Sequence, residues 1–150
     1  MGMTPPGGLQ GEAYIVTGGG TGIGKACAAR LAADGAAVTI CGRTEATLVD
    51  AAEYVAHNAA FDGSVNYVIA DVTSEDDVKR LVDSALQPTG ALNGIVANAG
   101  GGGGMGPLHL QNNDEFVRVL HLNVLGTLNC IKHTVHHMVA NGGGSFVAMS

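Results

Sequence analysis

The sequence predicts a doubly wound α/β fold, in which helices cover both faces of a parallel sheet. Three observations support this prediction. Short apolar segments typical of strands alternate with longer segments whose apolar residues recur at helical spacing. A glycine-rich turn separates the first strand from the first helix. Strands that alternate with helices need right-handed crossovers, which make the sheet parallel and place helices on both of its faces.

Each predicted strand is an apolar run bounded by turn residues. The first strand ends at Gly18. The fourth is followed by the loop 98–104, which is so rich in glycine that neither a helix nor a sheet would tolerate it. The predicted strands are, in chain order, 13–17, 36–41, 65–70, 94–97 and 145–150.

The predicted helices are defined by apolar periodicity and by their end signals. Thr44 is a favourable N-cap for the second helix. Ser74 is a favourable start for the third, because the acidic residues 75–77 that follow it suit the positive end of the helix dipole. The predicted helices cover 22–34, 44 to about 60, 74–87 and 113–140.

The last helix, 113–140, is expected to pack one face on the sheet. Asn141 and the glycines 142–144 are expected to end it. Residues at steps of three and four predict which face is buried. The predicted stripe consists of Phe116, Leu120, Asn123, Thr127 and Ile131.

Composition predicts one globular domain over 13–150, preceded by a loose tail over 1–12. Hydrophobic residues make up 46% of the chain and charged residues 13%, which argues against intrinsic disorder. A net charge of -6 offers no basic face for nucleic acid. The first ten residues carry neither the basic region nor the apolar region typical of a leader peptide, and no apolar run approaches the length of a membrane span. We therefore expect a cytoplasmic protein that binds neither nucleic acid nor a membrane.

The cysteines and histidines predict neither a disulfide framework nor a metal site. The three cysteines are far apart and odd in number, which favours a reducing compartment. His133, His136 and His137 could place two imidazoles on one helix face, but no acid or cysteine beside them in sequence completes a ligand set.

The glycine turn at 17–24 predicts an anion site at the start of the first helix. Main-chain N–H groups and the positive helix end converge there, where a pyrophosphate would lie. We expect Gly18 to form the tight turn, Gly22 to let phosphates approach the main chain, and Gly24 to let the helix lie close to the strand, because each role excludes a Cβ. The spacing is GxxxGxG rather than GxGxxG. A tight turn without a ligand is the alternative.

Four motifs, taken together and in this order, resemble the short-chain dehydrogenase/reductase family. They are TGGGTGIG at 17–24, Asp71-Val72, Asn98-Ala99-Gly100 and LNVLGT at 122–127. The resemblance covers 13–150. It implies a Rossmann domain that binds a nicotinamide cofactor, in a family that transfers hydride between that cofactor and a small carbonyl or alcohol substrate.

The resemblance also implies which residues contact the cofactor. Asp71 should accept a hydrogen bond from the adenine amino group, and Val72 should supply a main-chain contact beside it. The alternative for Asp71 is that it caps a helix. The cofactor-binding residues predicted in this way are Gly18, Thr21, Gly22, Ile23, Gly24, Arg43, Asp71, Val72, Asn98, Ala99 and Gly100.

The end of the second strand predicts NADP(H) in preference to NAD(H). A carboxylate at this place usually binds the ribose 2′-hydroxyl of NAD, whereas a cation accommodates the 2′-phosphate of NADP. Gly42 stands where an acid would be expected, and Arg43 offers a planar guanidinium. An ordinary solvated arginine is the alternative. Thr21 provides only a hydroxyl where many NADP-preferring relatives carry a second basic residue.

The resemblance implies one catalytic residue in this chain, Asn123, and shows that others are absent. An amide on an otherwise apolar stripe needs a partner, so Asn123 is either a placed functional group or a satisfied core residue. No Tyr-x-x-x-Lys occurs among the 150 residues. Ser150 aligns with the first serine of the family's strand-end pair, so we expect the catalytic serine to be the next residue.

Two functions follow as hypotheses. The first is an NADP-dependent oxidoreductase, of which these residues form the cofactor-binding part, truncated after the fifth strand and without turnover of its own. The second is a noncatalytic nucleotide-binding or interaction module. For the full-length form, the family resemblance implies a homo-oligomer that associates through the helix 113–140.

Overall fold

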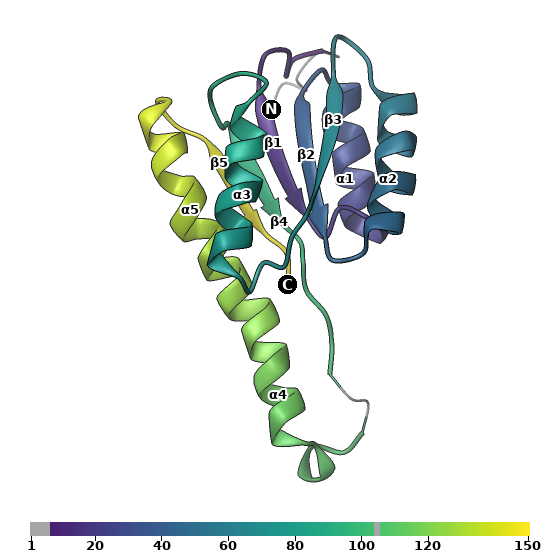
Figure 1. Cartoon of the computed structure of the whole chain (residues 1–150), viewed down its shortest axis with the longest axis vertical. Helices are drawn as coiled ribbons and strands as arrows, with labels where there is room; N and C mark the ends of the chain where they lie inside the picture. Colours follow the sequence, from purple (N-terminus) through teal and green to yellow (C-terminus); the bar gives the residue numbers. More distant parts are fainter. Residues whose placement is uncertain (1–6, 104–105) are drawn as a thin grey trace, which may run out of the picture.

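A five-stranded parallel sheet forms the centre of the molecule (Figure 1). The computed structural model describes residues 7–103 and 106–150. The strands lie in the order β3-β2-β1-β4-β5, so β1 is central and the chain reverses its direction of winding between β3 and β4. The strands are β1 (Ala13–Thr17), β2 (Ala37–Gly42), β3 (Ser64–Ile69), β4 (Gly94–Ala97) and β5 (Ser145–Ala148).

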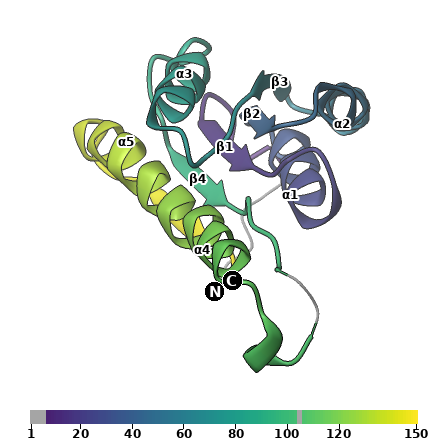
Figure 2. The same ribbon diagram turned by 60° about the horizontal axis from the view of Figure 1, so that its bottom comes forward.

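Helices cover both faces of this sheet, as Figure 2 shows. Helices α1 and α2 lie together on one face, whereas α3 and α5 lie on the other. The predicted doubly wound fold is therefore confirmed. The helices are α1 (Gly22–Ala33), α2 (Glu45–Asn58), α3 (Glu75–Leu86), the short 3-10 helix η1 (Leu108–Leu110), α4 (Asn113–Leu120), the π-helical turn η2 (His121–Leu125) and α5 (Gly126–Ala140).

The two faces of the sheet build two separate hydrophobic cores. Successive side chains of a strand point to opposite faces, so Ile15 packs toward α3 and α5 while its neighbour Val16 packs toward α1 and α2. Both side chains are fully buried. Leu48 of α2 and Leu81 of α3 are likewise fully buried, one in each core. Apolar strands buried on both faces are what a parallel sheet requires.

The predicted element boundaries agree with the structure to within a few residues. Strands β1 and β4 have the predicted limits, and the others differ by one or two residues at an end. The cap of α3 is confirmed, because the Ser74 hydroxyl accepts a hydrogen bond from the Asp77 main-chain N–H. Thr44 occupies the N-cap position of α2, but its side chain makes no capping hydrogen bond.

The prediction of which face of the last helix is buried is wrong. Phe116, Leu120 and Ile131 are 40% to 50% exposed, and α4 projects beyond the sheet with no buried residue (Figure 1). Helix α5 packs closely on α3 and on the β3–α3 connection, which favours small side chains on its buried face. The spacing of large apolar residues in the sequence therefore did not identify that face. That face is formed by Gly126, Asn129, Cys130, Thr134 and Met138.

The described part of the predicted tail contacts the domain. The Leu9 main-chain N–H donates to the Asp34 carbonyl at 3.0 Å, and the Glu12 carbonyl accepts from Ala37 at 2.9 Å. Residues 1–6 of that tail, and Gly104 of the predicted glycine loop, lie outside the described residues.

Candidate nucleotide-binding site

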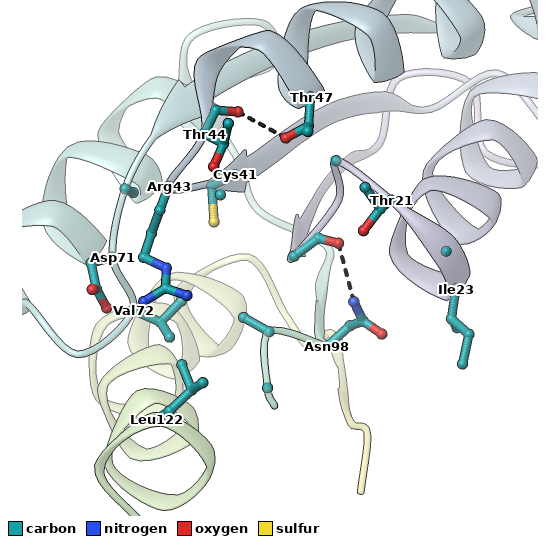
Figure 3. Close-up of a pocket in the computed structure, with 17 residues that line it drawn as sticks. Thr21, Ile23, Cys41, Arg43, Thr44, Thr47, Asp71, Val72, Asn98 and Leu122 are labelled. Atoms are coloured by element: carbon teal, nitrogen blue, oxygen red, sulfur yellow. Dashed lines mark hydrogen bonds between the residues drawn. The ribbon is translucent and has the colours of Figure 1, made fainter. Parts of the chain in front are cut away.

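A cavity of about 390 Å³ opens at the carboxyl edge of the sheet (Figure 3). The connections that follow β1, β2, β3 and β4 all contribute to its wall, together with Leu122 of the π-helical turn. In doubly wound folds ligands bind at this edge, where the winding reverses. Ten of the eleven predicted cofactor-binding residues line the cavity: Gly18, Thr21, Gly22, Ile23, Arg43, Asp71, Val72, Asn98, Ala99 and Gly100.

The remaining predicted residue, Gly24, does not line the cavity but packs directly against two residues that do. A Cβ on Gly24 would lie 2.6 Å from the Asn98 side-chain nitrogen and closer still to the Gly18 carbonyl oxygen. Gly18 has a φ of +63°, and a Cβ there would lie 2.9 Å from the same nitrogen. The start of α1 therefore lies against the strand ends only because both residues lack a side chain.

Gly22 differs from these two glycines because it borders open space. Its φ is +52°, and a Cβ on it would meet no atom within 4 Å. It lines the cavity at the first residue of α1, where N–H groups have no partner within the helix. A ligand can therefore approach the main chain closely at this point.

Thr17 joins the glycine turn to the segment after β4. Its buried hydroxyl accepts hydrogen bonds from the Asn98 N–H at 3.0 Å and from the Ala99 N–H at 2.9 Å. In return, the Asn98 amide donates to the carbonyl oxygens of Thr17, at 3.1 Å, and Gly18, at 3.3 Å. Sequence reasoning did not identify this role of Thr17. A polar residue at the end of an otherwise apolar strand was the only signal.

The end of β2 forms the opposite wall. Figure 3 shows the Arg43 side chain extending across the cavity toward Asp71 and Val72. A Cβ on Gly42 would lie 3.4 Å from the nearest atom, in Leu48, which is ordinary van der Waals contact, so a Cβ is accommodated here. The neighbouring Cys41 thiol is fully buried, and burial raises its pKa to about 12, so it stays neutral.

Asp71 has hydrogen-bond partners that hold the β3–α3 connection in shape. Its Oδ1 accepts from the main-chain N–H of Thr73, at 2.9 Å, and from the Thr73 hydroxyl, at 2.7 Å. Its own N–H donates to Asp77 Oδ2 at 2.9 Å, and this bond, assisted by Arg80, lowers the pKa of Asp77. The alternative that Asp71 caps α3 is wrong, because the cap is Ser74.

Asn123 lies in the π-helical turn and does not line the cavity. Its Nδ2 donates to the carbonyl oxygens of Gly101 and Val119, each at 2.8 Å, and its Oδ1 accepts from the Gly101 N–H at 3.2 Å. These bonds fasten the loop after β4 to the helix. The neighbouring Gly100 lines the cavity, so Asn123 acts on the site's edge through that loop.

The histidine cluster on the last helix forms no metal site among the residues that the structure describes. No group of three or more histidine, cysteine or acidic side chains there could hold a metal ion. His133 instead bonds Glu75 at 2.9 Å, and the rings of His136 and His137 lie 4.0 Å apart. Within the described residues, no helix has the length and hydropathy to cross a membrane.

Comparison with known proteins shows that the chain belongs to the short chain dehydrogenase family, whose model matches residues 12–150. It is 37% identical over 147 residues to the cis-4-hydroxycyclohexanecarboxylate dehydrogenase of Sinomonas cyclohexanicum, a match covering 94% of this chain and 57% of that protein. The chain spans about half the length of the curated relatives it matches. The predicted family is confirmed, and it is a family of oxidoreductases.

Solved relatives share the fold and contain either nicotinamide cofactor. An NAD⁺-bound xylitol dehydrogenase is 31% identical, with a TM-score of 0.85, over 92% of this chain and 52% of its own. A metagenomic short-chain oxidoreductase in complex with NADP is 25% identical, with a TM-score of 0.83, over 92% of this chain and 61% of its own. Both cofactors therefore occur among these neighbours, and the comparison favours neither NAD(H) nor NADP(H) for this chain.

The close approach at Gly24 generates a first prediction. We expect Gly24→Ala to lower the free energy of unfolding by about 1–3 kcal/mol, because its methyl group overlaps the Gly18 carbonyl and the Asn98 amide. Urea denaturation followed by circular dichroism measures this change. Gly102→Ala is the control, since a Cβ there meets nothing within 4 Å. An equal effect of the two substitutions would contradict the packing described.

Proposed function

We propose that this chain is the cofactor-binding part of an oxidoreductase that transfers hydride between NADP(H) and a small carbonyl or alcohol substrate. The observation that carries this proposal is the cavity itself. It brings the glycine turn, Arg43 and the Asp71-Val72 pair to one edge of the sheet, from three separate connections. The family membership supports the reaction class.

The glycine turn suits the diphosphate of the cofactor. Helix α1 contains 12 residues and begins at the cavity, so its dipole and its free N–H groups favour an anion there. The open space beside Gly22 leaves room for phosphate oxygens. The Asp71-Val72 connection on the far wall suits the adenine, and Asn98, Ala99 and Gly100 suit the part of the cofactor beyond the diphosphate.

The preference for NADP(H) rests on the wall at the end of β2. No carboxylate stands at Gly42 to repel a 2′-phosphate, and the Arg43 guanidinium reaches over the cavity. The hydroxyl groups of Thr21, Thr44 and Thr47 line the same cavity and add hydrogen-bonding capacity. The Thr47 hydroxyl also donates to the Thr44 carbonyl, at 2.8 Å (Figure 3).

We expect NADPH to bind at least roughly tenfold more tightly than NADH, since charge-assisted hydrogen bonds to one phosphate contribute about 1.5–3 kcal/mol. Arg43→Ala should remove most of this difference by weakening NADPH alone. Gly42→Asp should favour NADH, because a Cβ is accommodated at this position and a carboxylate there would repel a 2′-phosphate. Isothermal titration calorimetry on the chain and both variants measures these affinities.

Arg30→Ala is the control for these substitutions, because Arg30 is an exposed arginine that pairs with Asp34 at the end of α1, outside the cavity. It should leave the ratio of the two affinities unchanged. Equal affinity of the unmodified chain for NADPH and NADH would refute the preference. No uptake of either nucleotide would refute the proposed site.

Catalysis requires more groups than these 150 residues supply. A bound nicotinamide would donate or accept the hydride, and a proton donor tuned near neutral pH would act on the carbonyl oxygen. The chain contains no Tyr-x-x-x-Lys to serve as that donor and its pKa partner. We propose that Asn123 contributes by fixing the loop 100–101 at the edge of the cavity.

The chain by itself should therefore bind nucleotide without turnover. We expect no consumption of NADPH above the background rate when the 150 residues are incubated with a panel of small ketones and aldehydes, monitored by absorbance at 340 nm. Saturable turnover would show that other residues supply the proton. Nucleotide binding without turnover would also be expected of the second candidate, a noncatalytic nucleotide-binding or interaction module.

For the full-length form, the proposed assembly is a homo-oligomer that associates through the helix 113–140. This helix carries a second apolar stripe, distinct from its buried face, whose residues follow steps of three, four and four. Its members are 38% to 70% exposed: Val117, Leu120, Val124, Leu128, Ile131, Val135 and Val139. An exposed apolar stripe of this length favours association with another protein surface. A cytoplasmic location stays a prediction from the sequence.

Leu128→Glu tests this assembly, since a charge at the centre of the stripe would lose hydration on association. We expect the variant to sediment as a smaller species than the unmodified chain at the same concentration. Ile69→Glu is the matched control, because Ile69 lies on β3 with a comparable exposure of 43%. Identical sedimentation of the unmodified chain and Leu128→Glu would contradict the proposed interface.

A further inference from the structure

Helix α5 contacts the β3–α3 connection at two places and the first residue of α3 at a third. A Cβ on Gly126 would lie 2.6 Å from Val72 Cγ2, so the helix backbone rests directly on that side chain. One turn on, Asn129 Nδ2 donates to the Val72 carbonyl oxygen at 2.9 Å. Another turn on, Lys132 and His133 both bond the Glu75 carboxylate, at 2.8 Å and 2.9 Å. One helix face thus holds the connection and the start of α3.

Asn129 is the buried residue of this series that bonds through a polar side chain. It is only 2% exposed, whereas Lys132 and Glu75 are solvated. An amide removed from water costs free energy unless it is hydrogen-bonded, and a leucine of similar size would pack in the same place without that cost. A polar residue at this position can therefore bond the Val72 carbonyl, and an apolar residue cannot.

The carbonyl that Asn129 holds belongs to the cavity wall. Val72 and Asp71 both line the cavity, beside Arg43 (Figure 3). Their main chain is held from two sides: Asp77 of α3 accepts the Asp71 N–H, and Asn129 of α5 donates to the Val72 carbonyl. Without Asn129 one of the two anchors is lost, and the wall is free to shift relative to the glycine turn.

We infer that Asn129 is a positioning residue for the adenine end of the nucleotide, acting through the Val72 main chain without touching the ligand. The inference rests on the proposed function, which places the adenine against Asp71 and Val72. It assigns to α5 a part in nucleotide affinity that is separate from its proposed part in assembly. The glycine turn, which α5 does not hold, should keep its affinity for phosphate groups when Asn129 is changed.

Isothermal titration of Asn129→Leu with NADPH, 2′,5′-ADP and inorganic pyrophosphate tests the inference. We expect the variant to bind 2′,5′-ADP and NADPH roughly fivefold to tenfold more weakly, the effect of about one lost hydrogen bond. Pyrophosphate affinity should stay within about twofold. Amide hydrogen exchange at residues 71–73 should become faster, because the connection loses an anchor.

Thr134→Val is the matched control. Thr134 is fully buried in the same helix, and its hydroxyl donates to the Cys130 carbonyl within α5, away from the connection. It removes one buried donor, so its melting temperature should fall as in Asn129→Leu while its 2′,5′-ADP affinity stays unchanged. If Asn129→Leu fails to fold, Gly126→Ala displaces Val72 from the same side and should show the same selective loss of 2′,5′-ADP affinity.

Three results would overturn the inference. Nucleotide uptake by the unmodified chain together with undiminished 2′,5′-ADP affinity in the folded variant would overturn this inference and leave the proposed function intact. Equal weakening of 2′,5′-ADP and pyrophosphate would also overturn it, since that pattern reports general loosening. No uptake of any nucleotide by the unmodified chain would overturn the inference and the proposed function together.

Discussion

The site depends on the contact between the end of β1 and the segment that follows β4. The Thr17 hydroxyl accepts two main-chain N–H groups of that segment, and the Asn98 amide donates back to two carbonyl oxygens. These residues are about 80 positions apart in the sequence and meet because β1 and β4 are neighbours in the sheet. The Asn98 amide fills the space that a Cβ on Gly18 or Gly24 would need, so the two glycines and the asparagine constrain one another.

From this contact the remaining walls of the cavity follow in order. Because β1 is central, the connections after β2 and β3 lie on one side of the glycine turn and the segment after β4 on the other. A long ligand can thus run from Asp71, across the start of α1, to Asn98. The helix that continues the chain then stabilises both ends of the cavity: Asn123 holds the loop beyond Asn98, and Asn129 holds the connection beside Asp71.

Much of this arrangement could be predicted from the sequence, for definite physical reasons. Strands buried on both faces are continuous apolar runs, and a glycine turn between a strand and a helix leaves few other interpretations. The buried face of α5 could not be predicted, because Gly126, Asn129 and Thr134 are small or polar while most of the large apolar residues of the helix face outward. The roles of Thr17 and Asn129 were also missed, since each depends on a partner more than 50 residues away.

The thiol on the cavity wall has a practical consequence. Cys41 and Cys130 are both buried, and burial raises the pKa of each to about 12, so neither offers a thiolate to an alkylating or oxidising reagent in the folded chain. Cys27 is the more accessible of the three. A maleimide dye added under native conditions should therefore label Cys27 in α1 first, and delayed labelling of Cys41 and Cys130 would report the opening of the hydrophobic core that they share.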